Sequence, residues 1–175
     1  CHMPPIVYGV LDIHRSHRVE IPNVRRDVGA GRPHACTLCH LDRSAAWSAE
    51  AMRRFWGDDA GESPKSPDAE TASVPEAVLA LATGDVVQRA VYAAAFGAAD
   101  RRVDAAFEAE RRALLIATMG DAYPAVRRLA RRSLARRESA QSVLVDSTLS
   151  SVDWTDAAAR ARAAARIFSM NSPAG

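Results

Sequence analysis

Three residues with thiol or metal-binding chemistry lie close together in the chain: Cys36, Cys39 and His40, in the order Cys-Thr-Leu-Cys-His. Two thiols at positions i and i+3 lie on one turn, where each can form a thioether with a vinyl group of a porphyrin. The neighbouring imidazole can then bind the iron from the same side. This spacing is that of a c-type haem attachment site, and it predicts a covalently bound haem.

Two other chemistries use a C-x-x-C pair. A structural zinc site usually has a second ligand pair at recognisable spacing, but neither cysteine nor histidine occurs after His40. A thioredoxin-type redox site is expected within a β-α-β unit, and no such pattern surrounds the motif. We therefore interpret Cys36, Cys39 and His40 as a haem site, with a zinc half-site or a redox dithiol as the alternatives.

The chain begins Cys1-His2-Met3-Pro4-Pro5, which looks like the end of a second haem motif. On this interpretation the chain is the carboxy-terminal part of a longer protein, Cys1 forms one thioether, and His2 binds the iron. Two haem groups are then expected in this chain, the first with its other attachment cysteine missing. Two alternatives remain: His2-Met3 as a cloning remnant, and Cys1 as the lipid-modified first residue of a lipoprotein.

Histidines that precede the complete motif are candidates for a second axial ligand, because a low-spin haem iron takes one from elsewhere in the chain. These are His14, His17 and His34. Residues 6 to 35 contain Pro, Gly, Asn and Asp at short intervals, which predicts irregular chain with one extended piece from Ile6 to Val10. Such a segment has no core of its own, and a haem face would supply an apolar surface for it.

Composition favours a globular, mostly α-helical protein. Of the 175 residues, 48% are hydrophobic, 25% are charged and only 6% are aromatic, with abundant alanine. The net charge of +2 is too small to indicate a nucleic-acid or membrane partner. No apolar run approaches the roughly 20 residues that span a bilayer.

The sequence divides into a haem-binding segment at 1–57, a Pro-, Ser- and acid-rich linker at 58–72, and a helical module at 73–175. We expect a helix from an Asp42 cap to Gly57, with Trp47 and Phe55 on a face that is either ordinary core or packs on haem. In the module, a capping box from Ser73 to Glu76 begins a helix that Gly84 ends. Another helix is expected over 101–119, with Val103, Phe107, Leu114 and Ala117 inward, and a last one after a cap at Asp153 or Thr155.

A weak repeat occurs within the module. Residues 88–96 align with 126–134 at a spacing of 38, and a Gly-Asp pair precedes each copy. That period is typical of paired-helix solenoid repeats. The other faces of the second copy carry arginines, which form either a solvated helix face or a docking patch for an acidic redox partner or haem propionates. They are Arg127, Arg128, Arg131, Arg132, Arg136 and Arg137.

With these residues laid out, residues 1 to 57 resemble the last haem-binding segment of multihaem c-type cytochromes. The whole chain resembles those in which this segment is joined to HEAT-like helical repeats, although the helical part matches only in general pattern and the chain starts inside a motif. The matching residues are Cys1 to Pro4, His17 with Pro22, and Ala35 to His40 with Asp42 and Trp47. The resemblance implies that His17 is a distal ligand, with His14 second and His34 non-ligating.

The same resemblance implies a function: electron transfer in a periplasmic or extracellular bacterial protein, with redox proteins or other haem subunits as partners and without nucleic acid. Bis-histidine ligation leaves no open iron position, which favours electron relay over catalysis. The alternatives are a multihaem oxidoreductase that acts on a small nitrogen or oxygen species at an open haem, and a helical-repeat adaptor whose motif binds zinc or is incidental.

Overall fold

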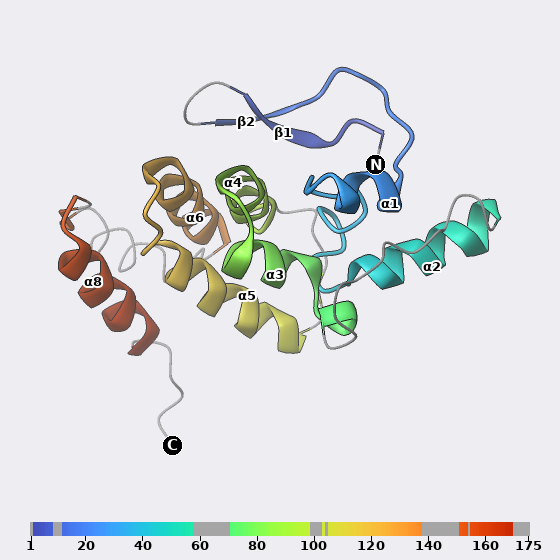
Figure 1. Cartoon of the computed structure of the whole chain (residues 1–175). Coiled ribbons are helices and arrows are strands. Elements are labelled where there is room, and N and C mark those ends of the chain that lie inside the picture. Colours follow the sequence, from blue (N-terminus) through green and yellow to red (C-terminus); the bar gives the residue numbers. More distant parts are fainter. Residues whose placement is uncertain are drawn as a thin grey trace.

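The structure is a computed structural model that describes residues 2–8, 12–57, 71–98, 103, 105–137, 151–153 and 155–169. Over this part the chain is mostly helical, with seven α-helices and one two-stranded sheet. This confirms the mostly α fold class (Figure 1). No helix in the described ranges is long and apolar enough to cross a membrane.

A β-hairpin begins the described chain. Strands β1 (Pro5–Tyr8) and β2 (Asp12–Arg15) pair antiparallel, with Pro5 opposite Arg15 and Tyr8 opposite Asp12. The hairpin lies above α4 in Figure 1, and its Val7 and Ile13 pack against the main hydrophobic cluster. The predicted extended piece covers most of β1, whereas β2 was not predicted, because its four residues are too few to show an alternating pattern.

Two helices flank the motif. Helix α1 (Val24–Gly29) begins after Asn23, whose side chain accepts the backbone N–H of Arg26 at 2.8 Å. Helix α2 (Ala45–Trp56) ends at Gly57, as predicted. The prediction of Asp42 as its cap is wrong, because Ser44 caps the helix by accepting the backbone N–H of Trp47 at 3.2 Å. Helix α1 was also not predicted.

The remaining elements are a 3₁₀ turn η2 (Thr71–Ser73) and helices α3 (Glu76–Thr83), α4 (Val86–Ala95), α5 (Ala105–Thr118), α6 (Pro124–Arg137) and α8 (Ala157–Ser169). Helix α3 packs on α4, α5 packs on α6 and α8, and α4 packs on α6. A Cβ at Gly97 would lie 2.6 Å from Ser133 Cα, so the close approach of the chain after α4 to α6 requires glycine. Most of the predicted linker, residues 58 to 70, lies outside the described residues.

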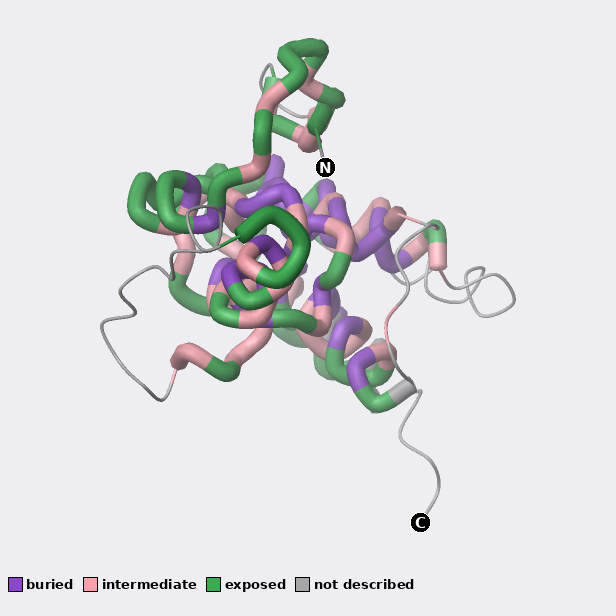
Figure 2. The backbone as a smooth tube through the Cα atoms, turned by 90° about the vertical axis from the view of Figure 1, so that its right-hand side faces the viewer, coloured by how far each residue is buried: buried purple, intermediate pink, exposed green. Residues whose placement is uncertain are grey.

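The motif segment and the helical module share one hydrophobic core. Leu38 and Leu41 belong to the same buried cluster as Tyr92, Phe96 and Leu134 of the module. Figure 2 shows the buried residues gathered on the inward sides of the helices. A smaller cluster of Val24, Ala49 and Met52 joins α1 to α2.

The two Gly-Asp pairs have different roles in the fold. Asp85 caps α4 and forms a capping box with Gln88. Asp121 instead accepts Arg89 Nε of α4 at 2.6 Å, and the same guanidinium donates to the carbonyl of Gly84 at 2.6 Å. The second Gly-Asp pair therefore links α4 to the turn between α5 and α6, whereas the first caps α4.

Several predicted faces differ from the structure. Phe107 is buried as predicted, but Ala117 is exposed, while Leu115 and Ile116 are buried. In α2 the buried residues are Ser48, Ala49 and Met52, whereas Phe55 is 70% exposed. The last helix begins after Asp156, which accepts the backbone N–H of Ala158 at 2.8 Å, while Asp153 accepts that of Thr155 at 2.9 Å.

Candidate cofactor-attachment site

Cys36 to His40 form one hydrogen-bonded helical turn. The backbone N–H of His40 donates to the carbonyl of Cys36 at 2.8 Å, and that of Leu38 donates to the carbonyl of His34 at 3.1 Å. Neither Cys36 nor Cys39 forms a disulfide, and both residues are half-buried. Their spacing places both on the same side of the turn.

The residues of this turn divide sharply by burial. Thr37, Leu38 and Leu41 are at most 1% exposed, whereas the imidazole of His40 is exposed and both cysteines are intermediate. The side chains without cofactor chemistry therefore anchor the turn in the core. Those that carry the chemistry remain accessible.

Two helices of the module hold the turn through polar contacts. Thr37 Oγ1 lies 2.7 Å from Glu76 Oε2 on α3, 2.7 Å from Tyr92 Oη on α4, and 3.1 Å from the carbonyl of His34. The backbone N–H of Glu76 also donates to the carbonyl of Arg43 at 3.1 Å. The predicted capping box from Ser73 is therefore wrong: the carboxylate of Glu76 contacts Thr37, and Pro75 at the helix start forms no side-chain cap.

Burial shifts the pKa values of this cluster. Desolvation raises the pKa of Glu76, although hydrogen bonds from Thr37 and Tyr92 oppose it, and raises the pKa of Tyr92 well above its ordinary value. Desolvation, followed by the neighbouring Cys39, also raises the pKa of the Cys36 thiol. A thiol with a raised pKa is the reverse of the activated thiolate that redox catalysis uses.

Trp47 of α2 positions the imidazole of His40. The two ring centroids lie 4.9 Å apart with an interplanar angle of 51°, and the Arg43 guanidinium lies 5.8 Å from the Trp47 ring centroid. Phe55, the other aromatic residue predicted for this face, lies instead against Trp56 at 5.7 Å. Of the two, Trp47 is the one placed beside the motif.

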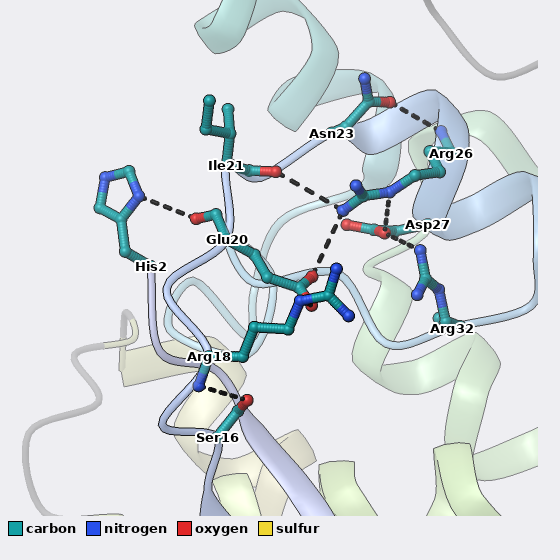
Figure 3. Close-up of polar contacts among 9 residues, drawn as sticks. All are labelled: His2, Ser16, Arg18, Glu20, Ile21, Asn23, Arg26, Asp27 and Arg32. Carbon is teal, nitrogen blue, oxygen red and sulfur yellow. Dashed lines mark hydrogen bonds and ion pairs between the residues drawn. The ribbon is translucent and has the colours of Figure 1, made fainter.

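His2 has a hydrogen bond that fixes its ring (Figure 3). Its Nδ1 lies 2.9 Å from the carbonyl oxygen of Glu20, whose backbone N–H donates to the carbonyl of His2 at 3.0 Å. As a donor, Nδ1 leaves the lone pair on Nε2, on the far side of the ring. Histidines that bind metals almost always donate their other ring N–H in this way. Cys1 lies outside the described residues.

The other histidines differ in exposure. His14 and His17 are exposed, and the His14 ring contacts that of Tyr8 at 5.8 Å. His34 has no exposed surface, and neither of its ring nitrogens has a hydrogen-bond partner. Burial lowers the pKa of His34, which favours the neutral form of its imidazole. None of the contacts described for His14 is with the motif. Nothing in the local sequence pattern indicated that His34 would be buried.

A mostly apolar pocket of about 240 Å³ lies beside the motif. It is lined by Pro4, just after His2-Met3, and by Ala35, just before Cys36, so it adjoins both predicted haem sites. Its other apolar lining residues include Ile6 and Val7 of the hairpin, Ile21 and Pro22 of the segment before α1, and Val87 and Val91 of α4. Neither His14 nor His17 lines it.

The polar edge of this pocket contains two arginines that share one carboxylate (Figure 3). Asp27, which is 7% exposed, accepts Arg26 Nε at 3.1 Å and Arg32 Nη2 at 2.8 Å. Arg26 also lies 3.6 Å from the carboxylate of Glu20. The pocket therefore combines an apolar wall with guanidinium groups at one side.

The predicted arginine patch is not one uniform surface. Arg127 is only 9% exposed because its Nη1 donates to the carbonyls of Asp121 and Ala122 at 2.7 and 2.8 Å, so its assignment to an exposed face or docking patch is wrong. Arg132 pairs with Asp12 of the hairpin at 3.1 Å. Arg128 is exposed and Arg131 is half-buried.

No protein-family model, curated protein or solved structure matches this chain. Over the described ranges, no three His, Cys, Asp or Glu side chains form a group that could hold a metal ion. Cys36, Cys39 and His40 thus do not form such a group as they lie in the structure. The function is inferred from these side chains and their geometry.

Proposed function

We propose that this chain carries electrons through c-type haem attached at Cys36 and Cys39, with His40 as an axial ligand. The observation that supports this most strongly is the division of the motif turn by burial: Thr37 and Leu38 lie in the core, whereas Cys36 and Cys39 are partly exposed and His40 is exposed. Thioether attachment requires both sulfurs on one side of a fixed turn. It does not require thiols and imidazole to converge, as a zinc site would.

The surrounding residues fit such a group. The apolar pocket that begins at Ala35 would cover one edge of a porphyrin, and Trp47 would restrict rotation of the His40 imidazole. Arg26 and Arg32 would pair with haem propionates, since guanidinium forks match carboxylate geometry. A bound haem supplies one-electron exchange at iron, and the protein sets its potential through axial ligands, burial and hydrogen bonds.

The second part of the proposal concerns Cys1 as an attachment cysteine and His2 as an iron ligand of a further haem. The hydrogen bond from His2 Nδ1 to the carbonyl of Glu20 supports His2 as an iron ligand, because it directs Nε2 outward. Both haem groups would adjoin the pocket between Pro4 and Ala35, and would therefore be neighbours. His17, and then His14, are the proposed distal ligands.

The wider setting follows from haem c chemistry, since this cofactor is attached outside the cytoplasm. We therefore propose a periplasmic or extracellular protein whose partners are redox proteins or other haem subunits, and not nucleic acid. The helix pairs α3–α4 and α5–α6 would act as a HEAT-like scaffold that holds the motif turn through Glu76 and Tyr92.

The experiment is to express the full chain together with haem c maturation proteins, and to measure its intact mass and its visible spectrum in both oxidation states. We expect two covalent haem groups. The variant Cys36→Ser/Cys39→Ser should retain one, and the matched control Cys1→Ser should lose only the other. A colourless wild-type protein, with or without zinc, would contradict the proposal.

The visible spectrum after addition of cyanide or nitrite distinguishes an electron carrier from an oxidoreductase. A haem iron with two histidine ligands has no open position, so the spectrum should remain low-spin and unchanged. A high-spin component that shifts with either ligand would favour the oxidoreductase instead.

A further inference from the structure

A second cavity, of about 250 Å³, lies between the hairpin and the helical module. Strand β2 forms one side, the end of α4 forms the floor, and α6 forms the other side. Its charged lining residues are Arg15 from β2, Arg132 and Arg136 from α6, and Asp12. We propose that this cavity, which we call the arginine cavity, binds a small oxyanion that presents a carboxylate or phosphate group.

The charges that line the arginine cavity support this proposal. Three guanidinium groups line the arginine cavity, and among its described lining residues Asp12 is the one acid. A cleft lined mainly by one sign of charge, with apolar walls, concentrates ions of the opposite sign. Arginine forks also bind carboxylate and phosphate oxygens through paired hydrogen bonds.

The small apolar residues that line the arginine cavity also support this proposal. Ala94, Ala95, Ala98 and Leu129 line the base of the arginine cavity. The small alanine side chains leave room for a ligand beside the arginines, and Ser133 adds a hydroxyl to the same lining. The lining also includes the exposed His14, so this histidine lies at the arginine cavity rather than at the pocket beside Cys36.

Asp12 acts as an internal competitor for the anion. Its two carboxylate oxygens lie 3.1 and 3.3 Å from Arg132 Nη1. The two side chains are 43% and 37% exposed, and such exposed pairs contribute little to stability. An incoming oxyanion would therefore share or displace this contact, and its binding would compete with attachment of the hairpin to α6.

The test is calorimetric titration of the full chain with citrate and, separately, with inorganic phosphate. We expect saturable binding of at least one. Arg136→Gln should weaken it about tenfold, which corresponds to about 1.4 kcal/mol. Asp12→Asn should strengthen it several-fold because the competitor is removed. The matched control is Arg128→Gln, an exposed arginine on α6 that does not line the arginine cavity.

Tighter binding of citrate than of phosphate would identify a carboxylate ligand, and the reverse a phosphate ligand. If Arg136→Gln alters the circular dichroism spectrum, Arg15→Gln on the exposed strand β2 replaces it. Absence of saturable binding for both anions would overturn the proposal. Equal weakening by Arg128→Gln would also overturn it, since this would show only a general effect of positive charge.

Discussion

His40 and His2, the two proposed proximal ligands, are held in different ways. The turn that ends at His40 is fixed by Thr37 and Leu38 in the core of the module. His2 is exposed, and two hydrogen bonds connect it to Glu20. The comparison indicates that the Cys36–His40 turn is held by the buried residues between its cysteines, whereas His2 is held by hydrogen bonds to one backbone position.

This difference has a consequence for assembly. The His40 turn is organised before any cofactor is attached, because its anchors belong to the folded core. His2 is exposed and its described hydrogen bonds are with Glu20, so this segment would gain further order from an attached haem. Mutations should therefore separate the two sites by their effect on folding.

The largest effect is expected for Leu38→Ala. Removal of this buried side chain leaves a cavity in the shared core, which typically lowers the free energy of unfolding by about 2–5 kcal/mol. Urea denaturation of the full chain measures this. The control is Ile21→Ala, at a side chain that is 78% exposed, which should remain within about 0.5 kcal/mol. Equal, small effects of both changes would show that the motif turn is not anchored in the core.

The next largest effect is expected for Thr37→Val. This change keeps the shape of the side chain but leaves Tyr92 Oη and Glu76 Oε2 without their shared partner, at a cost of about 1–3 kcal/mol. Thr37→Ser, which retains the hydroxyl, should recover most of the loss in the same denaturation measurement. If serine were as damaging as valine, the hydroxyl contacts would not be responsible.

A smaller effect concerns pH. Burial raises the pKa of Glu76 above its usual value near 4.5, so the folded protein binds this proton more tightly than the unfolded chain. The resulting stabilisation is fully present below that usual value and is lost as the pH rises through the raised pKa. Glu76→Gln should remove this decrease in unfolding free energy, measured by urea denaturation across the range. Parallel pH profiles for the two proteins would contradict this sign.

The smallest effect on folding is expected for His2→Ala. Because the ring is exposed, its loss should change the free energy of unfolding by no more than about 0.5 kcal/mol. The same variant should nevertheless alter the visible spectrum of the haem at Cys1, by removing its proximal ligand. A large loss of stability without a spectral change would contradict the proposed role of His2 and indicate a structural one.

Local signals in the sequence predicted much of the fold. Glycines 57 and 84 end their helices as expected, and the spacing of Cys36, Cys39 and His40 produces the expected single turn. These features depend on residues within a few positions of each other. The turn formed by the motif could therefore be predicted without knowledge of the tertiary structure.

Contacts between distant residues could not be predicted in this way. A local capping rule assigns the carboxylate of Glu76 to Ser73, but in the structure it meets Thr37, 39 positions earlier in the chain. The periodicity of α2 likewise identified residues that share a face, without indicating that Met52 would be buried and Phe55 exposed. In both cases, packing against residues distant in the sequence determines which contact forms and which side chain is buried.

The most direct measurement is peptide mapping by mass spectrometry, after the purified chain has been treated with a thiol-alkylating reagent. The protein would be produced with haem c maturation machinery. We predict that the peptide containing Cys36 to His40 carries one haem through two thioethers and no alkyl group. Recovery of that peptide without haem and with both cysteines alkylated would contradict the proposed function.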